Sequence, residues 1–107
     1  VGLASPEQIS SALSILIPQY PQIQVGVHLH ASAANWEPKL AAAINAGCRR
    51  IDGALKGIGG CPMAQDDLVG NMDTELIVQY LASREMVDGM NYQQLQLCSN
   101  LVSDVFQ

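Results

Sequence analysis

The sequence predicts an α/β fold in which about two parallel strands are flanked by helices. Apolar residues recur first at helical spacing, then at a period of two, and this alternation repeats along the chain. The expected order is helix, strand, helix, strand, helix, with short connections throughout. A strand, helix and strand joined this way form a βαβ unit, whose strands are parallel neighbours.

The first helix is expected to begin at Ser5-Pro6-Glu7-Gln8. Serine caps a helix, proline suits the first helical position, and glutamine three residues after the serine completes a capping box. The apolar face then follows at helical spacing: Ile9, Ala12, Leu13 and Leu16. Pro18 and Pro21 are expected to bracket the end of this helix.

A strand is predicted over residues 23–30, where apolar and other residues alternate with a period of two. This alternation places His28 and His30 on one face, about 6.5–7 Å apart along the strand. Two imidazoles so placed can converge on one metal ion near the carboxyl end of the strand. The opposite face is apolar, and helices are expected to cover it.

The second helix is expected to be capped by Ser32 or Asn35. Its apolar stripe is formed by Trp36, Leu40, Ala43 and Ile44. Gly47 follows where a left-handed helix end is needed, because glycine adopts that conformation without strain. Residues 48–54 then favour a short second strand, with Cys48 as a small core residue.

A glycine-rich loop follows the second strand directly. Its glycines are Gly57, Gly59 and Gly60. Glycine permits backbone angles closed to other residues, so we expect the loop to move while Pro62 fixes the backbone beside Cys61. We interpret the loop and the histidine pair together as one active site, with a metal on the histidines and a thiol on the loop. A phosphate-binding role for the glycines is an alternative, but the loop leads into Cys-Pro rather than directly into a helix.

Two helices are expected after this loop. Asn71 or Asp73 opens the first of them, with Glu75 in the first turn, where an acidic group suits the helix dipole. Asn91 and Gln94 suggest a capping box for the last helix. The predicted apolar face of that helix comprises Leu95, Cys98, Leu101, Val102 and Val105, so Cys98 is also expected to be a core residue.

The composition limits the function and the surroundings of the chain. A net charge of −5 with only five Lys and Arg argues against nucleic-acid binding. No apolar run approaches the roughly 20 residues needed to span a bilayer, so no membrane partner is expected. Three cysteines without a CxxC motif argue against a disulfide framework and favour a reducing compartment, and we predict a cytoplasmic protein.

The chain has too few strands for a complete fold. A closed (β/α)₈ barrel needs upwards of about 200 residues, whereas this chain has 107. Two parallel strands also leave two edges unpaired, and the sequence offers nothing further to cover them. We therefore expect the chain to be part of a larger protein, or to associate with copies of itself.

Four runs resemble the hydroxymethylglutaryl-CoA lyase family, in that family's order and over nearly the whole chain. They are Val27-His28-Leu29-His30, Ile51-Asp52, residues 57–62 and residues 70–75. The glycine loop with its Cys-Pro is the most specific of them. The resemblance implies that residues 1–107 are the C-terminal part of a TIM (β/α)₈ barrel, comprising its last two strands and flanking helices.

The resemblance also implies roles for individual residues. His28, His30 and Asn71 match ligands of a divalent metal, with Mg²⁺ or Mn²⁺ favoured by an otherwise oxygen-rich site. Cys61 matches the catalytic cysteine of the loop, and His28 is a candidate for the base. Glu75 matches an acidic position behind the ligands. The implied reaction converts 3-hydroxy-3-methylglutaryl-CoA into acetoacetate and acetyl-CoA.

The implied partners are an acyl-CoA substrate, the missing N-terminal part of the barrel and further copies of the chain in a homo-oligomer. Two departures from the family stand out: Ala31 replaces an aspartate common in lyases, and the stretch between Cys-Pro and Gly-Asn is one residue longer. The family's metal-binding aspartate and a neighbouring arginine belong to a first strand that this chain lacks. Two alternatives remain: a related Claisen-type synthase, such as isopropylmalate synthase, which shares the histidine pair, and a non-catalytic truncated fragment.

Overall fold

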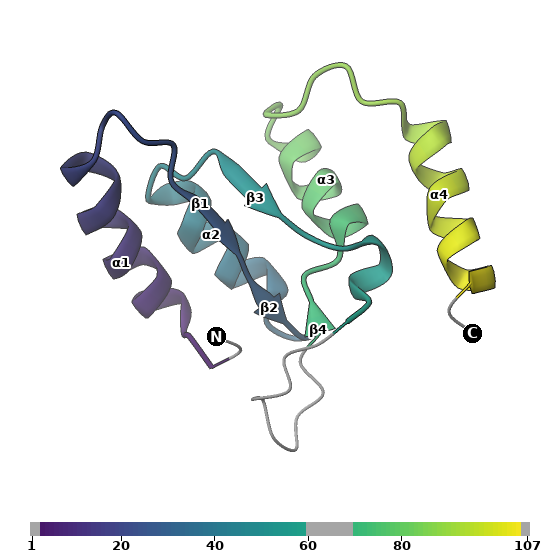
Figure 1. Ribbon diagram of the computed structural model, residues 1–107, viewed down its shortest axis with the longest axis horizontal. Helices are drawn as coiled ribbons and strands as arrows, with labels where there is room; N and C mark the ends of the chain where they lie inside the picture. The colour runs from purple at the N-terminus through teal and green to yellow at the C-terminus, as the bar shows by residue number, and fades with distance from the viewer. Residues whose placement is uncertain (1–2, 60–69, 106–107) are drawn as a thin grey trace.

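The computed structural model describes residues 3–59 and 70–105. Figure 1 shows the elements in the order expected, with two additional short strands. They are α1 (Pro6–Gln19), β1 (Gly26–His28), β2 (His30–Ala31), α2 (Trp36–Asn45), β3 (Arg50–Asp52), the 3₁₀ turn η1 (Leu55–Gly57), β4 (Gly70–Asn71), α3 (Thr74–Ser83) and α4 (Tyr92–Val105). Within the described ranges, every helix is too short or too polar to span a lipid bilayer.

The predicted βαβ unit is present. Strand β1 pairs with β3 in parallel, with Val27 opposite Ile51 and His28 opposite Asp52. Helix α2 makes the connection and lies behind the strand pair, with α1 on one side of it and α3 on the other (Figure 1).

The strand predicted over residues 23–30 is divided, and this is a correction. Its regular part is β1, and pairing changes at Leu29, whose carbonyl accepts a hydrogen bond from the Met72 amide at 3.1 Å. Strand β2 then pairs antiparallel with β4, with His30 opposite Asn71. The chain therefore leaves the β1–β3 pair one residue before His30.

Helices pack against the apolar face of the strands, as predicted, and leave part of it open beside α1. One core cluster joins α2 and α3 to the strand ends: Ala31, Leu40, Ile44, Met72, Ile77 and Tyr80. A second joins α1 to α2: Ile9, Leu13, Ala43 and Cys48, so the prediction of a buried Cys48 is confirmed. The outer residues of β1 and β3, including His28 and Asp52, are exposed on the opposite face.

The helix ends follow the predicted capping patterns with two differences. The Ser5–Gln8 capping box has both of its hydrogen bonds, and Gly47 is left-handed with a φ of 101°. Pro18 lies inside the last turn of α1 rather than after it. Asn35 is the N-cap residue of α2, but its side chain accepts a hydrogen bond from the Ser32 amide at 2.7 Å instead of capping the helix.

Helix α4 shows the largest departure from the expected burial. Its predicted apolar face is mostly exposed, with Leu101 at 61% and Val105 at 71%. Cys98 is exposed as well, so its prediction as a core residue is wrong. The residue that α4 buries is Ser99, at 5% exposure. Helical periodicity identified the apolar stripe, of which Leu95 and Val102 are partly buried, but the one residue that α4 buries in the described chain is polar.

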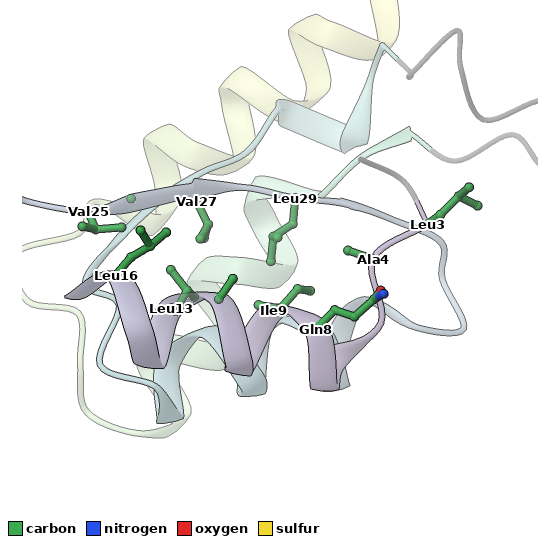
Figure 2. A pocket seen from close by; sticks show the side chains of 11 residues that line it. Leu3, Ala4, Gln8, Ile9, Leu13, Leu16, Val25, Val27 and Leu29 are labelled. Carbon is green, nitrogen blue, oxygen red and sulfur yellow. The ribbon is translucent and has the colours of Figure 1, made fainter. Parts of the chain in front are cut away.

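One side of the β1–α1 layer is open. Apolar side chains of α1 and of the strand region face each other across a groove of about 640 Å³ (Figure 2). They include Ile9, Leu13 and Leu16 from α1 and Val25, Val27 and Leu29 opposite them. Among the described residues, β3 is the only strand paired with β1, so the other edge of β1 is also free.

Candidate metal-binding site

Three short strands bring the predicted ligands together. His28 comes from β1, His30 from β2 and Asn71 from β4. The two imidazole rings have centroids 5.2 Å apart at an interplanar angle of 79°. The Nε2 atom of His28 lies 2.9 Å from the Oδ1 atom of Asn71. Two ring nitrogens and an amide oxygen are therefore gathered at the carboxyl end of β1.

His30 is buried at the centre of the proposed site. Its side chain is only 9% exposed, and burial lowers its pKa, with the nearby His28 lowering it further against a raising effect from the Gly70 carbonyl. A lowered pKa keeps the imidazole neutral, with a lone pair on one nitrogen. In the described part of the chain the buried Nδ1 atom has no hydrogen-bond partner, so the ring retains an unused polar atom.

Asn71 is oriented by the glycine loop. Its side-chain amide donates to the Ile58 carbonyl at 2.8 Å, and its backbone amide donates to the Gly59 carbonyl at 3.1 Å. Donation by Nδ2 leaves Oδ1 free to face His28. Gly57 and Gly59 adopt left-handed φ values of 64° and 83°, a conformation that residues with a side chain rarely adopt.

Gly60 and Cys61 lie outside the described residues, as does the rest of the segment to residue 69. The role of the Cys61 thiol in the loop therefore stays a prediction from the sequence.

Lys39 is a residue near the site that sequence reasoning missed. Its side chain is only 4% exposed, and its ammonium donates to the His30 carbonyl at 3.0 Å. Burial lowers the pKa of this lysine. Its position between Trp36 and Ala43 on the apolar stripe of α2 was the available signal, because a lysine there faces the core.

Glu75 lies behind the glycine loop. Its Oε2 atom accepts a hydrogen bond from the Lys56 amide at 2.9 Å, and its own amide donates to Asp73 Oδ1 at 2.9 Å. Burial raises the pKa of Asp73 to about 6, and the hydrogen bond to the Glu75 side chain and the negative charge of Glu75 raise it in the same direction. Burial alone would raise the pKa of Glu75, but the hydrogen bond from the Lys56 amide and the neighbouring Asp73 and Ser99 side chains lower it.

The donor set fits a divalent metal in part. Two imidazoles and an amide oxygen suit such an ion, and the buried Nδ1 of His30 without a partner is consistent with a ligand. No group of three or more His, Cys, Asp or Glu side chains gathers within residues 3–59 and 70–105.

Comparison with known proteins defines the class. Residues 1–102 match the HMGL-like family, so the chain belongs to that family. It is 30% identical over 95 residues to the hydroxymethylglutaryl-CoA lyase YngG of Bacillus subtilis, covering 89% of this chain and 31% of that protein. It is 31% identical over 102 residues to the (R)-citramalyl-CoA lyase of Chloroflexus aurantiacus, covering 95% and 32%.

A solved structure agrees with the fold. The HMG-CoA lyase from Acinetobacter baumannii, in complex with coenzyme A and 3-methylmalate, superposes with a TM-score of 0.79 at 29% identity. That match covers 95% of this chain and 33% of the lyase chain. The chain thus spans about a third of the length of the relatives it matches.

Proposed function

We propose that residues 1–107 are the C-terminal part of a TIM (β/α)₈ barrel and that the complete protein is a divalent-metal-dependent carbon–carbon lyase. The proposed substrate is 3-hydroxy-3-methylglutaryl-CoA. The observation that carries the proposal is the convergence of His28, His30 and Asn71 from three strands, in a chain of the HMGL-like family. Homology to lyase enzymes supports the reaction class, and the site residues are our assignment.

His28, His30 and Asn71 would hold the metal, together with a carboxylate from the rest of the barrel. The rest of the site is expected to be rich in oxygen, which favours Mg²⁺ or Mn²⁺. When bound, the ion would act as a Lewis acid that polarises the hydroxyl and carbonyl oxygens of the substrate. Lys39 would keep the His30 backbone in place through its bond to the His30 carbonyl.

The reaction balances with one proton removed and one added. A base takes the proton of the tertiary hydroxyl, and His28 is our candidate for it in this chain. The hydroxyl oxygen becomes the keto oxygen of acetoacetate as the adjacent C–C bond breaks. The electron pair of that bond passes to the acetyl-CoA enolate. We assign the proton that completes acetyl-CoA to Cys61 as acid or relay.

Citramalyl-CoA is the second candidate substrate. The Chloroflexus citramalyl-CoA lyase is as similar to this chain as the Bacillus hydroxymethylglutaryl-CoA lyase, at 31% and 30% identity. The two candidates are CoA thioesters that carry a tertiary hydroxyl, so the same three ligands would serve either of them. The remaining alternatives are a Claisen-type synthase and a non-catalytic fragment.

The rest of the barrel is the proposed partner for the open side of the chain. A parallel strand before α1 would pair with the free edge of β1 and close the apolar groove shown in Figure 2. We also propose an acyl-CoA substrate, a homo-oligomeric assembly and a cytoplasmic location, each as a prediction.

A substrate comparison tests the proposal. The complete protein, loaded with Mn²⁺, is given 3-hydroxy-3-methylglutaryl-CoA and citramalyl-CoA separately, and acetyl-CoA and the second product are quantified. We expect cleavage, with the former substrate preferred. Condensation of acetyl-CoA with a 2-oxo acid, without cleavage of either thioester, would favour the synthase. No reaction in either direction by the folded, metal-loaded protein would favour the non-catalytic alternative.

A further inference from the structure

The turn before the glycine loop is held in an unfavourable conformation. Lys56, in η1, has a φ of 55° and a ψ of 17°, a left-handed conformation that residues with a side chain rarely adopt. Its amide donates to the Glu75 carboxylate at 2.9 Å. A bond from a backbone amide to an ionised carboxylate is stronger than one to a neutral acceptor. Glu75 therefore offsets the strain of the turn.

Glu75 itself is attached to two helices. It lies in the first turn of α3, where its amide is bonded to Asp73. On the other side, Ser99 is the residue that α4 buries, at 5% exposure, and it contributes to the lowered pKa of the Glu75 carboxyl. The second carboxylate oxygen, Oε1, is buried and has no well-formed hydrogen bond within the described residues. Helix α4 also packs against η1, so this carboxylate lies where α3, α4 and the turn meet.

The turn passes directly into the segment that orients Asn71. A Cβ added at Gly57 would lie 2.8 Å from the Asn71 carbonyl oxygen, so these backbones are in contact. The carbonyls of the next two residues, Ile58 and Gly59, bind the Asn71 side chain and backbone. A shift of the Lys56 turn would consequently shift every group that orients Asn71 from this side.

We propose that Glu75 is a positioning residue that fixes the Lys56 turn and that, through Ser99, helix α4 is a structural support of the Asn71 position. The inference rests on the proposed function only in treating Asn71 as a metal ligand. The support itself is a property of the chain without metal or substrate.

Hydrogen exchange at the Lys56 amide tests the proposal in the metal-free, substrate-free complete protein. We expect Glu75→Ala to accelerate this exchange about ten-fold or more, because the amide loses its charged acceptor. Glu75→Gln retains an acceptor oxygen and should restore most of the protection. Ser99→Ala should produce a smaller acceleration at the same amide, of about three-fold.

Two matched variants provide the controls. Glu37→Ala removes an acidic residue from the same first-turn position of α2, and Ser103→Ala makes the same change one turn further along α4. Neither should alter exchange at Lys56. The proposal is overturned if Lys56 exchange is unchanged in both Glu75→Ala and Ser99→Ala, or if amides throughout α3 accelerate equally. It is also overturned if Ser103→Ala acts as strongly as Ser99→Ala. Because no activity is measured, these outcomes are independent of the lyase assignment.

Discussion

The Nε2 atom of His28 lies 2.9 Å from the Oδ1 atom of Asn71, although 43 positions separate the two residues along the chain. The contact exists because β1 leads into β2, and β2 pairs with β4. A residue at the carboxyl end of a parallel strand is thus joined to one that follows the glycine loop. The site depends on both backbone pairings.

Replacing His30 tests the metal assignment. In the complete protein, His30→Ala should lower Mn²⁺ affinity about 100-fold or more. Mutation of a group that only hydrogen-bonds to a metal ligand already lowers metal affinity about 10–100-fold, and loss of a ligand itself should cost at least as much. Isothermal titration measures the affinity, and circular dichroism checks that the fold is retained. Unchanged affinity in a folded variant would exclude His30 as a ligand.

The thiol prediction separates turnover from metal binding. Cys61→Ser should reduce turnover about 100-fold or more, as expected for loss of a general acid, while leaving metal affinity nearly unchanged. Cys98→Ser changes the exposed cysteine of α4 and is the matched control, with activity expected at the wild-type level. Equal loss of turnover and metal affinity in Cys61→Ser would contradict the assignment.

The Asp73–Glu75 pair predicts a pH dependence of stability. The pKa of Asp73 is raised from 3.8 to about 6 in the folded protein, so its contribution is fully present below pH 3.8 and is lost as the pH rises through about 6. Asp73→Asn keeps a side chain that can cap α3 but cannot ionise. The stability of the variant relative to wild type should therefore increase between about pH 4.5 and 7.5.

The lowered pKa of Glu75 acts in the opposite sense, since its contribution is present above pH 4.5 and is lost as the pH falls through its folded-state pKa. Wild type and Asp73→Asn both retain Glu75, so the effect of Glu75 on stability largely cancels when the two proteins are compared. Urea unfolding of the metal-free complete protein at the two pH values measures the difference. A difference between wild type and variant that does not change with pH would contradict the assignment of the raised pKa to Asp73.

Gly57 tests the contact that supports Asn71. Gly57→Ala would place a Cβ atom 2.8 Å from the Asn71 carbonyl oxygen at a φ of 64°. Gly89→Ala is the matched control, because it has a similar φ of 74° but nothing within 4 Å of the added atom. Both variants should incur about 1–2 kcal/mol of left-handed strain.

Only Gly57→Ala should lose a further amount of about 1–3 kcal/mol from the forced contact. It alone should also weaken Mn²⁺ binding, because Asn71 must move. Urea unfolding and metal titration of the two variants measure these effects. Equal destabilisation by both variants, with unchanged metal affinity, would show that the Gly57 contact does not position the ligand.

Much of the site is predictable from sequence because it depends on local periodicity. A period of two predicts His28 and His30 on one face of a strand; the strand is in fact divided at Leu29, with His28 exposed and His30 buried, yet their rings lie 5.2 Å apart. Asn71 came from the family resemblance alone. Strand β4 consists of two residues, too few to show a period, and its pairing with β2 is a long-range event.

The features that the sequence did not predict share one physical reason. A sequence pattern identifies which residues lie on one face of a helix, but not which other part of the chain packs against that face. Lys39 carries a charge on the buried face of α2, and its ammonium donates to the carbonyl of His30, a residue that the helical pattern does not identify as a neighbour. Leu101 and Cys98 lie on a recognisable apolar stripe, yet both are exposed, whereas the residue that α4 buries is the polar Ser99. Lys56 adopts a left-handed turn that its residue type disfavours, and a carboxylate 19 positions away supports it.

Side-by-side turnover assays of the complete protein and of the isolated 107-residue chain test the central claim most directly. Both are incubated with Mn²⁺ and 3-hydroxy-3-methylglutaryl-CoA, and acetoacetate and acetyl-CoA are measured. The account predicts equimolar products from the complete protein and none from the isolated chain, because the proposed site takes a carboxylate from the rest of the barrel and, among the described residues, one edge of β1 is unpaired. Failure of the folded, metal-loaded complete protein to cleave this or a related acyl-CoA, or turnover by a monomer of the isolated chain, would contradict it.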